Sequence, residues 1–228
     1  MKTIGLIGGL SWESTVDYYR IINREVNQRL GGAHSAPMLM YSFNFEEIVK
    51  FNSQNDFDGI GRRLIEESVK IEKAGADLLL LCANSAHRWA NEVQHAISIP
   101  IIHIADATGK EINRLGLKKV LLLGTRYTME GDFVIPKLKD KFGIEAVVPD
   151  STDRDFIHHI IFDELVVGDF KESTKSRLSE IIKKERDVEG VILGCTELPL
   201  IITQTDSTLP FINTTEIHAK AAVDFAIN

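Results

Sequence analysis

The chain has 228 residues, of which 44 % are apolar and 26 % charged, as is typical of a globular protein with a sizeable core. Its net charge of −7 argues against a nucleic-acid surface, which would favour a basic patch. No apolar run reaches the roughly 18 residues of a spanning helix, so we expect no membrane partner. The N-terminus leads directly into a strand-like segment and leaves no room for a signal peptide, which indicates a cytoplasmic protein.

The first half of the chain alternates predicted strands and helices. Short apolar or β-branched runs predict strands at residues 3–7, 37–43, 76–81 and 99–104. Helical spacing of apolar residues predicts helices at 16–30, 45–50, 60–74, 85–96 and 105–115. Ser11 is a candidate N-cap for the first helix, and Ser14 or Thr15 is another. The polar segment 52–58, which contains Gln54, is expected to be a loop.

The second half continues in the same way. Strands are predicted at 119–123, 144–148, 188–193 and 208–212, with helices at about 130–142, 156–165, 171–186 and 214–227. Segment 149–155 is expected to be a loop. Alternating strands and helices of this length indicate an α/β fold with parallel sheets covered on both faces.

The two halves have similar layouts. Residues 3–9 correspond to 120–125, and residues 78–82 correspond to 191–195. We therefore predict two similar α/β domains, each a parallel sheet flanked by helices, with the active site in the cleft between them. The predicted domains are residues 1–106 with the returning helix 213–228, and residues 107–212. Ligands in such sheets bind beyond the carboxyl ends of the strands.

The only two cysteines occupy equivalent positions in these halves. Cys82 and Cys195 each end a short apolar run, and residues that can cap a helix follow each of them. Helix N-termini stabilise negative charge, so the pKa of both thiols is expected to lie below the free value of about 8.5. Alternatively, both thiols are small buried apolar groups or form a disulfide, which is uncommon in the cytoplasm.

Two alternative roles for Cys82 involve His87, as a catalytic base or as a fellow metal ligand. His87 could activate Cys82 as a base, although helical geometry turns it away from the thiol. A zinc site with both cysteines would need a fourth ligand, and the spacing is unfamiliar for zinc, so no metal is expected.

The turns at Gly8-Gly9 and Gly124-Thr125 could bring backbone amides close to a small anion.

Four segments, in this order along the chain, resemble the aspartate/glutamate racemase family and most closely its aspartate racemase branch. They are residues 8–15 (GGLSWEST), 82–87 (CANSAH), 123–129 (LGTRYTM) and 194–199 (GCTELP). The resemblance implies an isomerase that racemises aspartate, and in some members glutamate, without pyridoxal phosphate, metal or other cofactor. It also implies a homodimer of two-domain subunits.

The same resemblance assigns roles to individual residues. Cys82 and Cys195 match the family's two catalytic cysteines, which remove and return the α-proton on opposite faces of the substrate. By analogy, Cys82 acts on the D-isomer and Cys195 on the L-isomer. The implied substrate-binding residues are Leu10, Gln54, Asn84, Ser85, Thr125 and Thr196.

Two positions depart from the family pattern. Ser85 stands where the family commonly has threonine, which keeps the hydroxyl. Val166 and Val167 occupy a turn where some relatives carry a lysine that reads the substrate's side-chain carboxylate, so Arg126 or Lys171 is expected to contribute instead. Two rival functions remain: a cysteine-dependent decarboxylase or isomerase of dicarboxylates, and a small-anion binding protein with structural cysteines.

Overall fold

The computed structural model describes all residues 1–228 and divides into two compact units. The first comprises Met1–His103 with His218–Asn228, and the second comprises Ile104–Ile217. These divisions lie within a few residues of the predicted domain limits. They differ because helix α5 (Ile104–Arg114) belongs entirely to the second unit, whereas helix α11 (Thr214–Ile227) begins in the second unit and ends in the first.

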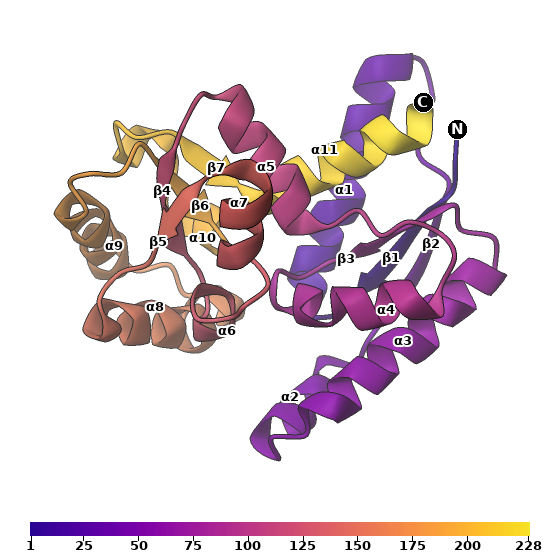
Figure 1. Cartoon of the computed structure of the whole chain (residues 1–228), viewed down its shortest axis with the longest axis horizontal. Coiled ribbons are helices and arrows are strands. Elements are labelled where there is room, and N and C mark those ends of the chain that lie inside the picture. Colours follow the sequence, from indigo (N-terminus) through magenta and orange to yellow (C-terminus); the bar gives the residue numbers. More distant parts are fainter. The chain divides into compact units, whose positions relative to one another are not determined.

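The first unit contains a parallel sheet of three strands in the order β2-β1-β3 (Figure 1). The strands are β1 (Ile4–Gly8), β2 (Met38–Ser42) and β3 (Leu78–Leu81). The helices are α1 (Trp12–Leu30), α2 (Phe45–Ser53), α3 (Phe57–Lys73), the 3₁₀ turn η1 (Ser85–Trp89) and α4 (Ala90–Ala96). Ser11 is the N-cap of α1, as its sequence position predicts.

Alternate side chains of β3 enter two different cores, one on each face of the sheet. Leu79 and Leu81 pack with residues of α3 and α4, whereas Leu78, Leu80 and the following Cys82 pack with residues of α1 and α11. The side-chain period of a strand is two, so Cys82 continues the series that faces α1 and α11. The register of one buried strand therefore decides which helices surround this thiol.

The predicted strand at residues 99–104 is wrong. Only one bridge, between Leu79 and Ile101, continues the sheet beyond β3. At this bridge the carbonyl of Pro100 accepts from the N–H of Leu79 at 2.9 Å, and the N–H of Ile102 donates to Leu79 at 3.0 Å. Pro100 has no N–H with which to continue the ladder, and α5 begins two residues after Ile102, so no longer strand forms.

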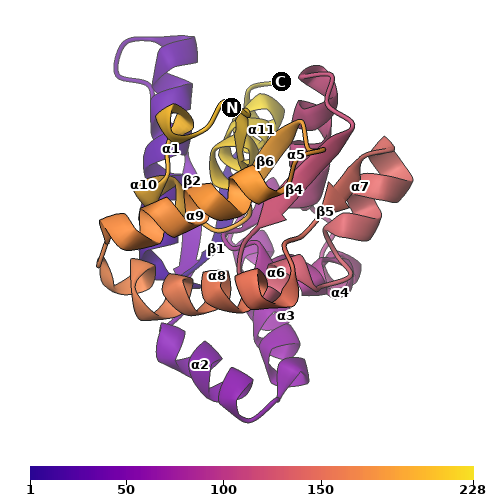
Figure 2. The ribbon, with the colours of Figure 1, turned by 90° about the vertical axis from the view of Figure 1, so that its left-hand side faces the viewer.

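The second unit contains a parallel sheet of four strands in the order β5-β4-β6-β7. The strands are β4 (Lys119–Leu123), β5 (Glu145–Val147), β6 (Gly190–Leu193) and β7 (Phe211–Asn213). The other elements are α6 (Arg126–Met129), α7 (Ile135–Phe142), α8 (Ser151–Asp163), η2 (Leu165–Val167), α9 (Glu172–Lys184), α10 (Leu198–Ile201) and η3 (Gln204–Asp206). Helices α8 and α9 lie side by side (Figure 2). Parallel sheets flanked by helices confirm the predicted α/β class.

Two helix boundaries in this unit differ from the prediction. Segment 149–155 is not a loop, because Asp150 caps α8 by accepting a hydrogen bond from the N–H of Asp153 at 3.0 Å. The helix predicted at about 130–142 begins only at Ile135, as α7, and the separate short helix α6 precedes the predicted range. Its expected end is confirmed, since Gly143 adopts the left-handed conformation after α7.

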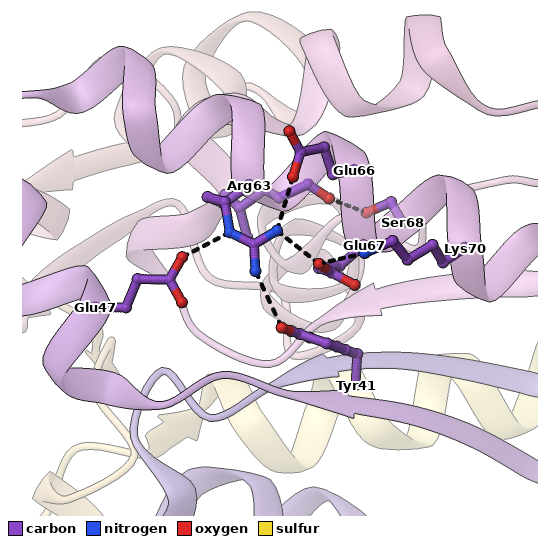
Figure 3. Close-up of polar contacts among 8 residues, drawn as sticks. Tyr41, Glu47, Arg63, Glu66, Glu67, Ser68 and Lys70 are labelled. Carbon is purple, nitrogen blue, oxygen red and sulfur yellow. Dashed lines mark hydrogen bonds and ion pairs between the residues drawn. The ribbon is translucent and has the colours of Figure 1, made fainter.

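An ion-pair network in the first unit joins α2 and β2 to α3 (Figure 3). Arg63 on α3 donates to Glu47 at 2.6 Å, to the hydroxyl of Tyr41 at 3.1 Å and to the buried Glu67 at 2.6 Å. Burial acts to raise the pKa of Glu67, but hydrogen bonds from Lys70 and Arg63 hold it below its ordinary value. Arg63 therefore holds α2 against α3.

None of the helices of the chain is long and apolar enough to cross a membrane.

The turn after β1 predicts a steric requirement that unfolding can test. Gly9 has φ of +75°, and a Cβ there would lie 2.3 Å from the backbone of Phe43. Gly32 also has positive φ, +55°, but faces open space. In urea unfolding, Gly32→Ala should cost about 1–2 kcal/mol, the backbone penalty alone. Gly9→Ala should cost more, above about 3 kcal/mol, because the clash adds to it. Equal losses would contradict this explanation.

Candidate active site

Cys82 is the first residue after β3 and is completely buried. Its N–H donates to the carbonyl of Ile7 on the neighbouring strand β1 at 2.9 Å, so the hydrogen-bond ladder fixes its backbone. The segment after β1 contains Leu10, which is half-buried against the core shared with β3. Parallel strands end at the same edge of a sheet, so Leu10, Cys82, Asn84 and Ser85 lie at one edge of this unit.

The predicted helix cap after Cys82 is wrong. Asn84 is in the right-handed helical conformation and its side chain makes no capping hydrogen bond, and the residues that follow form a short 3₁₀ turn. The expected low pKa of the thiol is also wrong, because complete burial raises the pKa of Cys82 far above its ordinary value. Desolvation of the thiolate therefore outweighs any stabilisation from this turn.

A buried pair near Cys82 has no counterpart in the sequence prediction. Tyr18 on α1 belongs to the same core cluster as Cys82, and its hydroxyl lies 2.7 Å from Nδ1 of the buried His218 on α11. Burial, together with the charge of Cys82, raises the pKa of Tyr18. The two residues are 200 positions apart, and each fits an ordinary helical pattern, so no local pattern connects them.

His87 packs within a group of imidazoles. Its ring centroid lies 4.8 Å from that of His103 and 5.2 Å from that of His218. Its Nδ1 donates to the carbonyl of Ala83 at 3.0 Å. This geometry supports the structural role that helical spacing suggests, because the nitrogen is bonded to the backbone of its own turn rather than to the thiol.

Cys195 follows β6 and Gly194 and is half-buried. Its Sγ donates to Oε2 of Glu197 at 2.8 Å, and the hydroxyl of Thr196 donates to the same oxygen at 2.7 Å. The predicted capping role of Thr196 and Glu197 is wrong, since neither side chain caps the four-residue helix α10. Glu197 instead gives Cys195 a buried carboxylate as its immediate neighbour.

The pKa of Cys195 also differs from the sequence expectation. Burial raises it well above its ordinary value, and the negative charge of Glu197 raises it further. The thiol is therefore protonated in this arrangement, with its hydrogen directed at a carboxylate. Both cysteines are free, so the structure contains no disulfide.

Thr125 follows β4 and lies beside the Cys195 loop. A Cβ on Gly124 would lie 3.0 Å from the carbonyl oxygen of Gly194, so the two loops approach closely at this glycine. The N–H of Arg126 donates to Nδ1 of His158 on α8 at 3.3 Å, which anchors the start of α6. The structure thus brings Thr125, Cys195 and Thr196 to one edge of the second sheet.

The remaining predicted residues are placed differently. Gln54 is exposed at the C-terminal end of α2, outside the group around Cys82. Lys171 pairs with Glu164 at 2.9 Å and with Asp169 at 3.2 Å, so two carboxylates already hold its ammonium. Arg126 pairs with Asp155 through one nitrogen, Nη2.

Comparisons with known proteins identify several similar chains. The profile of the family described as Asp/Glu/Hydantoin racemase matches residues 7–222. The chain is 27 % identical to the broad specificity amino-acid racemase RacX of Bacillus subtilis over 227 residues, 96 % of each chain. It resembles the crystal structure of a candidate Asp/Glu racemase from Yersinia pestis, with a TM-score of 0.94, 42 % identity and full coverage of both chains. An aspartate racemase homologue from Pyrococcus horikoshii has a TM-score of 0.86 and 38 % identity, also with full coverage.

The Cys195–Glu197 contact predicts a measurable change in thiol ionisation. The Cys82→Ser background leaves Cys195 as the only thiol. In that background, Glu197→Gln should move the midpoint of pH-dependent alkylation by iodoacetamide downward by about one unit or more, because it removes a neighbouring negative charge. Glu92→Gln, an exposed change of equal charge on α4, should leave the midpoint unchanged. An unchanged midpoint in Glu197→Gln would show that the carboxylate does not control this thiol.

Proposed function

The chain belongs to the Asp/Glu/Hydantoin racemase family, whose members are isomerases, and we propose that it interconverts L- and D-aspartate with Cys82 and Cys195 as its two acid–base groups. Glutamate is the second candidate substrate. The observation that carries the proposal is the similar placement of the two free thiols, with Cys82 directly after the fully buried strand β3 and Cys195 one residue beyond the fully buried strand β6.

The proposed reaction exchanges one proton at the α-carbon. One cysteine, as thiolate, takes the α-proton and becomes a thiol while the C–H electron pair remains on the substrate. The other cysteine then gives its thiol proton to the opposite face of that carbon and becomes a thiolate. By family analogy, Cys195 takes the proton of the L-isomer and Cys82 that of the D-isomer. Glu197 is placed to accept the proton of Cys195 beforehand.

Negative charge develops on the substrate's α-carboxylate as the proton leaves, so hydrogen-bond donors directed there contribute most to the rate. We assign this binding to Asn84, Ser85, Thr125 and Thr196, with the backbone at Leu10. Each of them follows a strand at the carboxyl edge of its sheet. Gln54 stays a prediction from the family resemblance alone.

Recognition of the side-chain carboxylate is assigned to Arg126 rather than Lys171. The guanidinium carries five N–H donors, and its contact with Asp155 uses one nitrogen. Because Arg126 also pairs with Asp155, we expect it to discriminate only weakly between amino-acid substrates with different side chains. The relative RacX is named as a broad-specificity racemase, which supports a substrate range wider than aspartate and glutamate as the second candidate function.

The proposal includes a homodimer that works without pyridoxal phosphate, metal or another cofactor, in the cytoplasm, where both thiols stay reduced. A dicarboxylate decarboxylase or isomerase, or an anion-binding protein, would give different results. A decarboxylase releases carbon dioxide, and a binding protein leaves the α-hydrogen in place.

Deuterium exchange tests the reaction itself. In heavy water and without added cofactor, the protein should place deuterium on the α-carbon of L- and D-aspartate while the optical rotation falls to zero. A panel of other amino acids in the same assay defines the substrate range. Binding of aspartate without exchange of its α-hydrogen would reject the proposed activity.

Single substitutions test the need for two thiols. Cys82→Ala and Cys195→Ala should each lower racemisation by a factor of at least about 10³, because general acid–base groups contribute about 10²–10⁴-fold and each turnover needs both. Cys82→Ser and Cys195→Ser are the size-matched controls and should be equally impaired. Near-normal turnover in either alanine variant would disprove the two-thiol mechanism.

The assignment of Arg126 predicts a selective loss. Arg126→Ala should raise KM for aspartate about tenfold, a loss of about 1.4 kcal/mol, without a similar change for alanine, which has no side-chain carboxylate. Lys171→Ala is the matched control and should change KM for aspartate less than about twofold, because Glu164 and Asp169 already hold that ammonium. Equal effects on aspartate and alanine would indicate a general loss of structure.

A further inference from the structure

The hydrogen-bond chain beside Cys82 has a fixed direction. Nε2 of His218 lies 2.5 Å from the carbonyl oxygen of Ile102, which can only accept. Nε2 therefore carries the ring hydrogen. In a neutral imidazole the other nitrogen then accepts, so the Tyr18 hydroxyl, 2.7 Å from Nδ1, must be the donor.

The imidazole of His218 is neutral at physiological pH. Burial, assisted by the neighbouring His87, lowers the pKa of His218 to about 3. The titratable groups that contact this ring are Tyr18 and His87, and His103 packs in turn against His87. The Ile102 carbonyl sets the tautomer of His218.

The Tyr18 oxygen is left with lone pairs only. Its single hydrogen is bonded to His218, whereas the thiol of Cys82 lies in the same fully buried cluster. A thiolate in such a place needs a hydrogen-bond donor to offset the loss of water. Tyr18 could supply one only by turning its hydrogen away from Nδ1, which would leave a buried nitrogen unpaired.

We propose that His218 is a positioning residue that controls the proton on Cys82 by holding the Tyr18 hydroxyl as its own donor. The inference rests on the proposed role of Cys82 as an acid–base group. It predicts that Cys82 is a protonated thiol in the resting protein. The thiol of Cys195, by contrast, is hydrogen-bonded to the carboxylate of Glu197.

The test measures the ionisation of Cys82 alone, in the full chain without substrate. In the Cys195→Ser background, Cys82 is the only thiol. Its ionisation is followed by thiolate ultraviolet absorbance against pH, with Cys82→Ser/Cys195→Ser as the blank for tyrosine. Adding His218→Leu frees the Tyr18 hydroxyl to donate to the thiolate. The midpoint should fall by at least about one unit, a tenfold rise in the ionised fraction below the midpoint.

A second substitution separates this effect from a general change in the core. In the His218→Leu background, Tyr18→Phe removes the donor and should return the midpoint to the parent value or above. A midpoint unchanged by His218→Leu, or a fall that persists in the double variant, would overturn the proposal.

Tyr18→Phe with His218 intact is the further control, and it remains informative if His218→Leu fails to fold. Because the hydroxyl is already bonded to His218, this variant should move the midpoint by less than about half a unit. A rise of more than about one unit would show that Tyr18 already donates to Cys82 and would overturn the proposal. Racemisation is measured separately, so loss of the thiol effect and loss of the enzyme activity are distinguishable outcomes.

Discussion

The complete burial of the strands that precede the two cysteines is the constraint on which the rest of the site depends. Residues of β3 and β6 are covered on both faces, so neither strand can carry a polar side chain along its length. The chain can become polar only where the ladder ends, which is where Cys82 and Cys195 follow. A rigid ladder holds the backbone there, and this rigidity gives a reacting group a defined position.

The two thiols are similar in position but opposite in electrostatic surroundings. Cys82 shares its buried cluster with Tyr18, whose hydroxyl contacts His218, an imidazole with its pKa lowered to about 3. Cys195 donates to the carboxylate of Glu197. Burial raises the pKa of both thiols, and the negative charge of Glu197 raises that of Cys195 further, so the two cysteines differ in the group that each thiol proton faces.

The sequence predicts the positions of these groups better than their chemistry. Periodicity located the strands, the turns after them and both cysteines, because burial on two faces leaves an unbroken apolar run. The predicted direction of the shift in the thiol pKa was wrong. The expected helix N-termini are a 3₁₀ turn and a four-residue helix, and the effect of burial on the pKa is larger than any effect of these turns. The Tyr18–His218 contact joins residues 200 positions apart, and no local pattern could have revealed it. The strand predicted at 99–104 was wrong because Pro100 has no N–H to continue the ladder with β3 and α5 already begins at Ile104.

Internal ion pairs limit what two surface cations of the second unit, Lys171 and Arg126, can bind. Lys171 is held by two carboxylates, and Arg126 shares its charge with Asp155. An anion that approaches them must compete with these internal partners, which weakens any charge-based selection of the side chain. The hydroxyl of Thr196 is likewise engaged within the protein, since it donates to Oε2 of Glu197 at 2.7 Å. Either cation must therefore give up an internal carboxylate before it can pair fully with an external anion.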